Sequence, residues 1–476
     1  MAVGEPPVST ARRLRSGGRR ARCLPEEPPL TVRDVLTRGR QANPLPEGTL
    51  AVGVGLLVNG VCTYGFLVVS ARALGTVEYA PLGVLWAVFF LAGPGFFLPL
   101  EQEVSRALAA RRGRGLGTGP VLLRAAVLGG SLFAALVVVG LAFSPVLVGE
   151  LFSGDWLLLF ALLVGFGAFY VSHLARGSFS GLVRFRAYSV LIGADGLFRL
   201  VLCVGLALVG VEVAGPYGLV LGLAPYLAVA FALRGQRHLV TPGPGAPWSE
   251  LSTALGWLLL GSVLAQTLPN IPVVAAKVLA SEGQDAAVGQ FQVGLIVARV
   301  PLFLFQAVQA ALLPKLSALA SAGRVEEFKA GFRRLVLVVV GIGACGTIGA
   351  VSAGPWVTRL LFGAEFDLGN RTLGLLALGS ALYMLALAMA QAVIALHGHV
   401  RQSFVWLASV VAFLGVVVAT SLADMELFLR AELGLIGGAA VAAVGMGWVV
   451  VERIRSGAVA TEESLVEALH DVVLEP

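Results

Sequence analysis

The stretch Val288–Leu313 reads VGQFQVGLIVARVPLFLFQAVQAALL, and it decides the class of fold. It is long and apolar enough to cross a bilayer as a helix of about 20 residues. Arg299 lies near its middle, where an arginine that faces lipid costs about 2.5 kcal/mol or more. We therefore expect the guanidinium to face protein, water or an anionic ligand.

Polar side chains accompany Arg299 on one expected helical face. Gln292 and Gln306 lie seven residues to either side of it, a spacing that places them on the same face. The preceding apolar run carries a similar polar stripe, which consists of Gln266, Asn270 and Lys277. The two helices are predicted to line a water-filled cavity. The alternative is a buried arginine that carbonyls and amides satisfy in a static bundle.

The composition indicates that the whole chain, and not only this stretch, is typical of a membrane protein. Of its 476 residues, 57% are hydrophobic and 13% are charged, and the mean hydropathy is +0.87. Soluble domains do not have such a composition, so the chain is expected to be a polytopic membrane protein. The four cysteines show no metal or disulfide spacing, and no catalytic or phosphate-binding motif is found. The sequence therefore predicts neither an enzyme nor a cofactor.

Twelve apolar runs follow residues 1–48, and each is predicted to span the membrane as a helix. They lie approximately at 49–71, 80–102, 121–143, 156–175, 187–209, 213–233, 252–276, 287–313, 335–353, 372–396, 403–422 and 432–451. The expected fold class is thus all-α, a polytopic membrane bundle of about 12 transmembrane helices.

The basic residues are distributed unevenly between the two sides of this bundle. Most of the 34 lysines and arginines fall in segments on the same side as residues 1–48. The positive-inside rule then places both termini in the cytoplasm, with the chain in a bacterial inner (plasma) membrane. We attribute the net charge of +6 to this membrane surface and expect no nucleic acid as a partner.

The two halves of the chain repeat each other in several short matches. Val68–Leu74 matches Val273–Leu279, and Gly218–Gly222 matches Gly434–Gly438. Because each half holds six predicted spans, the halves are expected to be two parallel six-helix repeats. The expected organisation is a disordered basic cytoplasmic arm (1–48), an N-terminal six-helix lobe (49–234), a cytoplasmic linker (235–251), a C-terminal six-helix lobe (252–455) and an acidic cytoplasmic tail (456–476).

Prolines interrupt two of the predicted spans. Pro94 and Pro99 lie in the second span, and Pro269 and Pro272 lie in the seventh. Each removes a backbone hydrogen bond and is predicted to kink its helix, which would allow the two lobes to rock. The alternative is that these prolines are tolerated without a role.

Three segments resemble a known family. Ala71–Gly75 (ARALG) is similar to a signature of polysaccharide flippases in the multidrug/oligosaccharidyl-lipid/polysaccharide exporter superfamily. Leu361–Phe366 (LFGAEF) resembles the stretch after the ninth span of that group, and Arg176–Tyr188 with Gly196–Leu200 resembles its fourth-to-fifth-span region. The resemblance covers roughly residues 49–455. It implies a two-lobed bundle that flips a polyprenyl-diphosphate-linked oligosaccharide from the inner to the outer leaflet by alternating access.

The resemblance also implies a cationic cavity, with Arg72 as the cation that belongs to the family pattern. The implied partners are the lipid-linked oligosaccharide, membrane lipid, and a polysaccharide polymerase or glycosyltransferases. Arg299 is a candidate because of its position near the middle of a predicted span, and not because of the resemblance. The candidate substrate-binding residues are Arg299, Arg72, Arg199, Lys277, Gln292, Gln306, Asn59, Gln266 and Asn270.

Two other functions stay open. A cation-coupled drug or small-molecule antiporter of the same fold would need an intramembrane carboxylate, and Asp195 is the one well inside a predicted span. Asp195 precedes Arg199 by four residues, so it is a candidate for ion coupling and equally for an internal ion pair. A membrane glycosyltransferase or polymerase would need acidic residues on a sizeable external loop, and the external loops here are short.

Overall fold

The computed structural model describes residues 49–251, 255–302, 305, 319, 324–396 and 398–456. The predictions for the N-terminal arm, for Gln306 and for the tail after Ser456 lie outside these residues. Every regular element of the described part is a helix, and ten helices are long and apolar enough to cross a membrane. The prediction of an all-helical membrane bundle is confirmed.

The first helix, α2 (Thr49–Gly113), consists of two spans that join at Gly75. Gly75 has φ 67° and ψ 178°, a backbone conformation that suits glycine. The rings of Phe66 and Trp86 stack with their centroids 5.9 Å apart, whereas twenty residues of unbroken helix would separate them by about 30 Å. The chain therefore folds back at Gly75, and the first two predicted spans form a hairpin.

The other helices of the first half follow the predicted spans. Small residues bring α5 onto α2, because a Cβ at Gly177 would come within 2.6 Å of the Glu101 carbonyl oxygen. The N-cap Asp155 accepts a hydrogen bond from the Leu157 backbone N–H at 2.7 Å and so begins α5. The elements are α3 (Gly119–Ala142), α4 (Ser144–Val146), η1 (Leu147–Leu151), α5 (Trp156–Gly181), α6 (Phe185–Leu208), α7 (Ala214–Leu233) and the short η2 (Trp248–Glu250).

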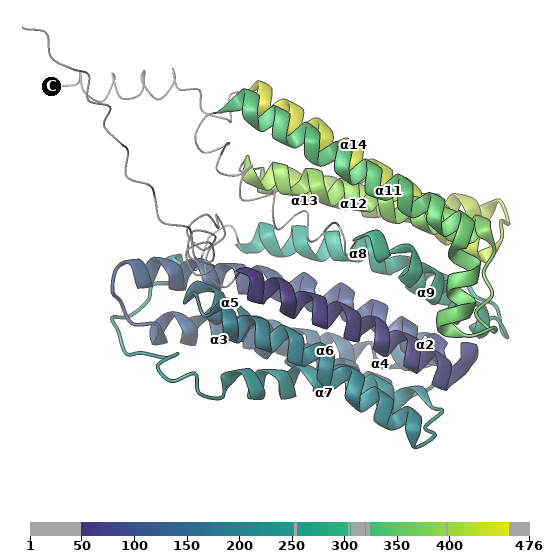
Figure 1. Cartoon of the computed structure of the whole chain (residues 1–476), viewed down its shortest axis with the longest axis horizontal. Helices are drawn as coiled ribbons and strands as arrows, with labels where there is room; N and C mark the ends of the chain where they lie inside the picture. The colour runs from purple at the N-terminus through teal and green to yellow at the C-terminus, as the bar shows by residue number, and fades with distance from the viewer. Residues whose placement is uncertain are drawn as a thin grey trace, which may run out of the picture. The chain divides into compact units, whose positions relative to one another are not determined.

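Helices α11 to α14 of the second half pack mainly among themselves, whereas α8 and α9 also pack on α2. Figure 1 shows α11 to α14 on one side and α3 to α7 on the other, with α8 and α9 between them. α8 packs against both α2 and α13, so it joins the two groups. The elements are α8 (Leu255–Leu279), α9 (Asp285–Ala298), α11 (Val325–Phe362), α12 (Asn370–Ala395), α13 (His399–Leu422) and α14 (Leu427–Arg455).

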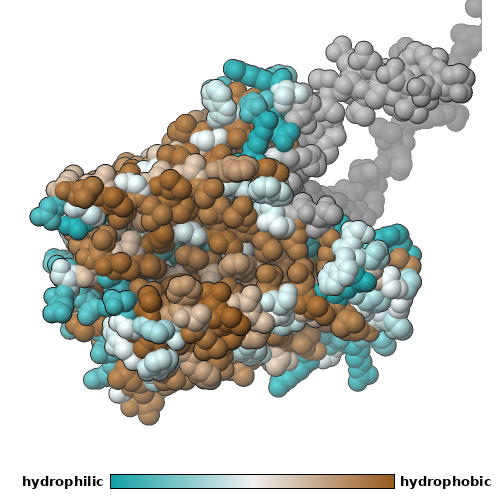
Figure 2. Space-filling view, turned by 180° about the vertical axis from the view of Figure 1, so that it is seen from behind, coloured by the Kyte–Doolittle hydropathy of each residue, from teal (hydrophilic) through white to brown (hydrophobic). Residues whose placement is uncertain are grey.

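The outer surface of the bundle is apolar around its middle. Figure 2 shows a hydrophobic band there, with hydrophilic residues gathered at the two ends. Large side chains in this band are exposed, for example Val138 at 65% and Val444 at 74%. A soluble protein rarely exposes so large an apolar surface, so the band is the face that meets lipid.

The eighth predicted span is not a continuous helix through Arg299. α9 ends at Ala298, and Arg299 is its C-cap residue with φ −93° and ψ −1°. Pro301 has no backbone N–H and its ring clashes with the carbonyl four residues earlier, which interrupts the helical hydrogen bonds. The prediction that an unbroken helix runs through Arg299 is therefore wrong.

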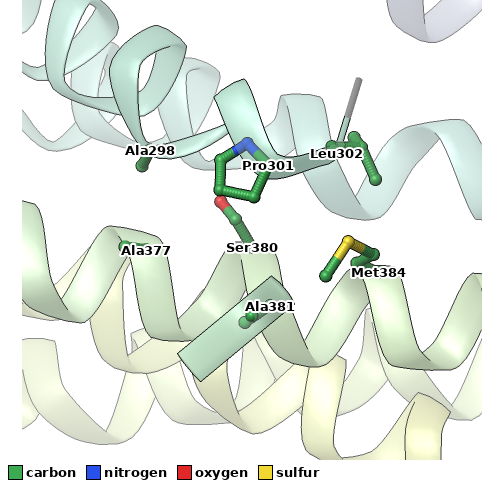
Figure 3. Close-up of a pocket in the computed structure, with 8 residues that line it drawn as sticks. Ala298, Pro301, Leu302, Ala377, Ser380, Ala381 and Met384 are labelled. Carbon is green, nitrogen blue, oxygen red and sulfur yellow. The ribbon is translucent and has the colours of Figure 1, made fainter. Parts of the chain in front are cut away.

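The helix break at Arg299 and Pro301 packs tightly against α11 and α12. Figure 3 shows Pro301 facing Ser380 of α12. On α11, a Cβ at Gly346 would come within 2.4 Å of Pro301 Cγ, so the glycine makes room for the proline ring. The position of Arg299 thus depends on contacts with α11 and α12.

Candidate functional site

A cavity of about 570 Å³ lies between the two helix groups, within the usual size range of small-molecule sites. α2, α5, α6 and α7 line one wall, and α8, α12, α13 and residues after α9 line the other. It extends toward the end of the bundle that carries residues 234–251, which we call the linker end. Gln102 and Trp257 lie at this mouth, where both are exposed.

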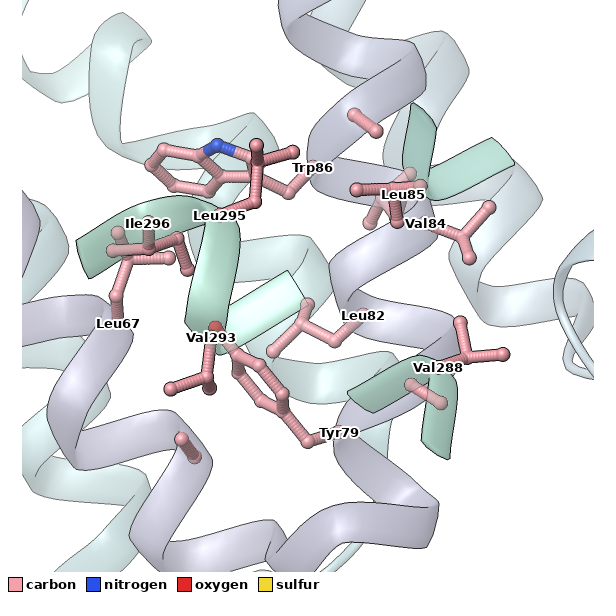
Figure 4. Close-up of a cluster of buried hydrophobic side chains, with 14 of the residues drawn as sticks. Leu67, Tyr79, Leu82, Val84, Leu85, Trp86, Val288, Val293, Leu295 and Ile296 are labelled. Carbon is pink, nitrogen blue, oxygen red and sulfur yellow. The ribbon is translucent and has the colours of Figure 1, made fainter. Parts of the chain in front are cut away.

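The opposite end of the interface is closed by apolar contacts. Figure 4 shows Tyr79 and Leu82 of α2 packed with Val288 and Val293 of α9. We call this contact, formed by residues 76–82 of α2 and 288–296 of α9, the seal. A Cβ at Gly289 would come within 2.2 Å of the Thr76 carbonyl oxygen, so the two backbones almost touch. The cavity therefore opens toward the linker end and not through the seal.

Arg299 lies on the cavity wall at the helix break. Its Nη1 donates to Asn270 Oδ1 at 3.5 Å, and its Nη2 is buried without a hydrogen-bond partner in the described part of the chain. None of the ion pairs among the described residues includes it. An uncompensated buried charge is costly, so the geometry favours water or an anion beside this guanidinium.

Arg199 on the other wall has its own counter-ion. Its Nη2 donates to Asp195 Oδ2 at 2.7 Å, and its Nη1 donates to Thr63 Oγ1 at 3.3 Å. The structure thus forms the internal ion pair that the four-residue spacing predicts. Asn59 lies nearby on the cavity wall, and its Oδ1 is buried without a partner among the described residues.

Six of the predicted site residues line the cavity, and others lie away from it. The cavity brings together Asn59, Asp195, Arg199, Gln266, Asn270 and Arg299. Gln292 is buried at 2% exposure and packs on Gly83 of α2, so it lies in the interface between the halves rather than on the cavity wall.

Arg72 and Lys277 lie near the seal in this conformation. Arg72 Nε donates to the Leu361 carbonyl at 2.6 Å, at the C-terminal end of α11. Lys277 Nζ donates to Asp285 Oδ1 at 2.5 Å and to Ser153 Oγ at 3.2 Å. Both cations therefore bind the ends of neighbouring elements and do not line the cavity, so a substrate-binding role for either of them stays a prediction.

A second polar cluster of the cavity was missed by sequence reasoning. His173 Nδ1 lies 2.7 Å from Glu101 Oε2, and Arg176 Nε lies 3.2 Å from the same oxygen. Tyr188 donates from its hydroxyl to Glu101 Oε1 at 3.1 Å. His173 and Arg176 line the cavity, with Glu101 behind them at 7% exposure. We call these four residues the His173 cluster.

Asp195 is not the only carboxylate that the helices of the described part enclose. Glu101 is buried, and Glu432 in α14 has 0% exposure with both carboxylate oxygens lacking a hydrogen-bond partner in the described part of the chain. Both glutamates fall at the edge of a predicted span, and α2 and α14 extend beyond those edges. The signal that could have found the cluster is the spacing of His173 and Arg176, three residues apart on one helical face.

Comparison with known proteins supports the fold. No protein-family model matches the chain. An uncharacterized protein of Mycobacterium tuberculosis is 27% identical over 383 residues, which cover 77% of this chain and 84% of that protein. A second uncharacterized protein of the same species is 28% identical over 369 residues, covering 74% and 81%.

Solved structures of similar fold are MATE transporters. A multidrug resistance MATE family transporter of the MOP superfamily in its inward-facing conformation has a TM-score of 0.68 at 16% identity, covering 86% of this chain and 99% of that chain. The outward-facing conformation of such a transporter gives 0.65 at 16% identity, covering 86% and 96%. The chain therefore has the fold of these MATE transporters.

Proposed function

We propose that the chain is a membrane transporter that flips a polyprenyl-diphosphate-linked oligosaccharide by alternating access. The observation that carries the proposal is Nη2 of Arg299, which lies on the wall of a central cavity and has no partner among the described residues. The other cavity-lining arginines of the described part, Arg176 and Arg199, each pair with a carboxylate. A phosphate offers the charge and the planar contact that suit a free guanidinium.

The opposite wall suits the apolar part of such a substrate. Trp86 and Phe90 lie with ring centroids 4.4 Å apart, and Phe89 and Phe169 are equally close. All four line the cavity. Arg299 on the wall from the second half would thus hold the head group. The aromatic patch on the first-half wall, which also carries the paired Arg176 and Arg199, would hold the neighbouring isoprenoid.

The conformation is compatible with loading from the cytoplasm. The basic residues predict that the linker end is cytoplasmic, and the cavity opens toward that end while the seal closes the other. Opening of the seal would then release the substrate on the outer side.

A cation-coupled drug or small-molecule antiporter is the second candidate, and the solved neighbours favour it because they are multidrug transporters. Asp195 on the cavity wall and the buried Glu101 behind that wall also favour it. However, Asp195 is bound to Arg199, and the first span contributes Asn59 and Thr63 to the cavity but no acid. The charge of the ligand distinguishes the two functions.

Binding to the full chain in lipid nanodiscs tests the proposal. The probes are geranylgeranyl diphosphate and the uncharged geranylgeraniol. A charge-assisted hydrogen bond is worth about 1.5–3 kcal/mol, so Arg299→Gln should weaken binding of the diphosphate roughly 10- to 150-fold. Arg299→Lys keeps the charge but loses the planar fork, and should weaken it less.

Arg359→Gln is the matched control, because Arg359 pairs with Asp367 at the surface and is 54% exposed. It should bind the diphosphate like the wild type. Equal binding of both probes, or unchanged binding in Arg299→Gln, would contradict the anionic substrate. Tighter binding of a lipophilic cation in Arg299→Gln would favour the antiporter.

A further inference from the structure

The His173 cluster places a histidine between the cavity and a buried carboxylate. His173 is 3% exposed and lines the cavity, whereas Glu101 lies behind it. The Phe169 ring stacks on the imidazole with centroids 5.8 Å apart, which holds its plane. In the neutral tautomer that donates Nδ1–H to Glu101, the lone pair is on Nε2, and a proton can add there.

Glu101 is held as an anion by its surroundings. Arg176 provides a counter-charge at 3.2 Å, and His173 and Tyr188 occupy its two oxygens. Hydrogen bonds that several donors make to a carboxylate stabilise its charged form. The group of the cluster that can take up a further proton is therefore the imidazole.

The elements that pack on α5 bring few other titratable groups toward His173. On α3, Arg124 lies over the Trp248 ring at 4.8 Å, and on α7, Tyr226 donates to the Val164 carbonyl, so both are directed elsewhere. The charged and titratable groups of the described residues to be considered are Glu101 of α2, Arg176 of α5 itself, Tyr188, Asp195 and Arg199 of α6, and Arg299 across the cavity.

We propose that His173, oriented by Glu101, is a proton-binding site of the cavity, and that its protonation strengthens the binding of an anionic head group. The proposal rests on the anionic substrate proposed above. Without the proton, the charges of Glu101 and Arg176 cancel; with it, the cluster carries one positive charge on the cavity wall. The linkage is reciprocal, so binding of an anion draws a proton onto His173.

The structural cost of protonation distinguishes His173 from Asp195. Protonation of Asp195 would free the charge of Arg199 but would also break an ion pair with 2.7 Å geometry. Protonation of His173 adds a charge without breaking a contact, because Nδ1–H continues to donate to Glu101. The proton site is thus built to change the cavity's charge at small structural cost.

The test uses a full-length protein in which His173 is the single histidine. The other four histidines of the chain are replaced in the variant His238→Gln, His397→Gln, His399→Gln, His470→Gln. ¹⁵N-histidine NMR in nanodiscs follows the imidazole from pH 5 to pH 9, with and without geranylgeranyl diphosphate. We expect the resonance to titrate, with its midpoint at higher pH when the probe is bound.

Binding assays complete the test. The diphosphate should bind roughly tenfold more tightly at pH 5.5 than at pH 8.5, and geranylgeraniol should show no such difference. His173→Gln should lose the gain at low pH, whereas Asp195→Asn with Arg199→Gln should retain it. Glu101→Gln, which removes the carboxylate that orients the ring, should reduce it.

The outcomes separate this inference from the proposed function. A His173 resonance that does not titrate overturns the inference, whether or not the probe binds. Binding that needs Arg299 but does not change with pH overturns the linkage alone and leaves the proposed function intact. If the probe does not bind at any pH, both the proposed function and the linkage fail.

Discussion

The two ends of one interface have opposite character. Toward the linker end, the helix groups separate around a cavity whose walls carry Arg176, Arg199 and Arg299. Toward the other end, Tyr79 and Val288 pack in an apolar seal with 1% and 0% exposure. α2 lines the cavity and also forms part of the seal. The different character of the two ends therefore does not follow from which helices meet there. Small residues at the seal allow backbones to touch, whereas large and charged residues at the cavity keep the helices apart.

The comparison teaches how the chain can hold charges inside a membrane. In the cavity, Arg199 is paired and Arg299 has room for a ligand. Near the seal, Arg72 and Lys277 satisfy carbonyls and a carboxylate on neighbouring elements. Arg299 on the cavity side can therefore bind a ligand, whereas the cations near the seal stabilise one conformation.

The largest effect is expected from breaking the ion pair on the cavity side. Asp195→Asn would leave Arg199, whose side chain is 4% exposed, without its counter-ion, and should lower the free energy of unfolding by about 3–5 kcal/mol. The double change Asp195→Asn, Arg199→Gln should recover most of that loss. Thermal unfolding in nanodiscs measures both. If Asp195→Asn is as stable as the wild type and loses gradient-driven transport, Asp195 is a coupling site instead.

The next effect tests the seal. Gly289→Val would push its side chain into the Thr76 carbonyl, 2.2 Å from the Cβ position, and should disfavour the closed seal by about 2–3 kcal/mol. A maleimide should then reach Asn59→Cys from the seal side, in a background without native cysteines. Gly341→Val is the control, because a Cβ there meets nothing within 4 Å. Unchanged labelling in Gly289→Val would show that the seal does not gate the cavity.

A smaller effect, at the linker end, depends on pH. Glu250 accepts from Arg111 Nε at 2.7 Å and Nη2 at 3.0 Å. These hydrogen bonds hold the pKa of Glu250 below its ordinary value, against the effect of burial, and Arg114 and Arg124 add to the lowering. The Arg111–Glu250 pair should contribute about 1 kcal/mol to the free energy of unfolding after allowance for solvent. This contribution should be fully present at pH values above the pKa of the glutamate in the unfolded chain, which is about 4.3. The contribution should be lost as the pH falls through the pKa of Glu250 in the folded protein, which is lower.

Unfolding midpoints of the wild type and Glu250→Gln, measured from pH 8 to pH 3, check this sign. The difference between the two proteins should be constant from pH 8 to pH 5 and should shrink below about pH 4. A difference that grows on acidification would contradict the assignment.

The smallest effect is expected from Arg72, which is exposed although it donates to Leu361 across the two halves. Arg72→Gln should weaken the closed state by less than about 1 kcal/mol, and so shift cavity labelling a few-fold. Arg72→Lys should keep part of the contact, because it retains the charge near a helix C-terminus. A complete loss of transport in Arg72→Gln would instead favour the substrate-binding role that the family resemblance implies.

Part of the candidate site could be predicted because its signal is local. A mid-span arginine between polar stripes indicated the wall formed by Arg299, Asn270 and Gln266, and the cavity contains all three. The helix break was also visible in the sequence, as Pro301 two residues after Arg299. Treating that segment as one helix placed Gln292 on the cavity wall, whereas it packs on Gly83.

The spacing of His173 and Arg176 is local, but the contact of His173 with Glu101 could not be predicted from local pattern, because these two residues are 72 residues apart. Their contact depends on the register of α5 on α2. Gly177 and Gly181 set that register, since a Cβ at either would come within 2.6 Å of a carbonyl oxygen of α2. One helical turn of sliding would move the imidazole about 5 Å from the carboxylate.

The sequence by itself determined the membrane class, most of the spans and the spacing that allows Asp195 to pair with Arg199, because hydropathy and short helical spacings are properties of neighbouring residues. The tertiary structure decided which end of the interface closes, which cavity arginine lacks a carboxylate partner among the described residues and which carboxylate meets His173. These depend on the approach of helices far apart in the chain, and contacts such as those at Gly289 and Gly177 appear only when the helices pack.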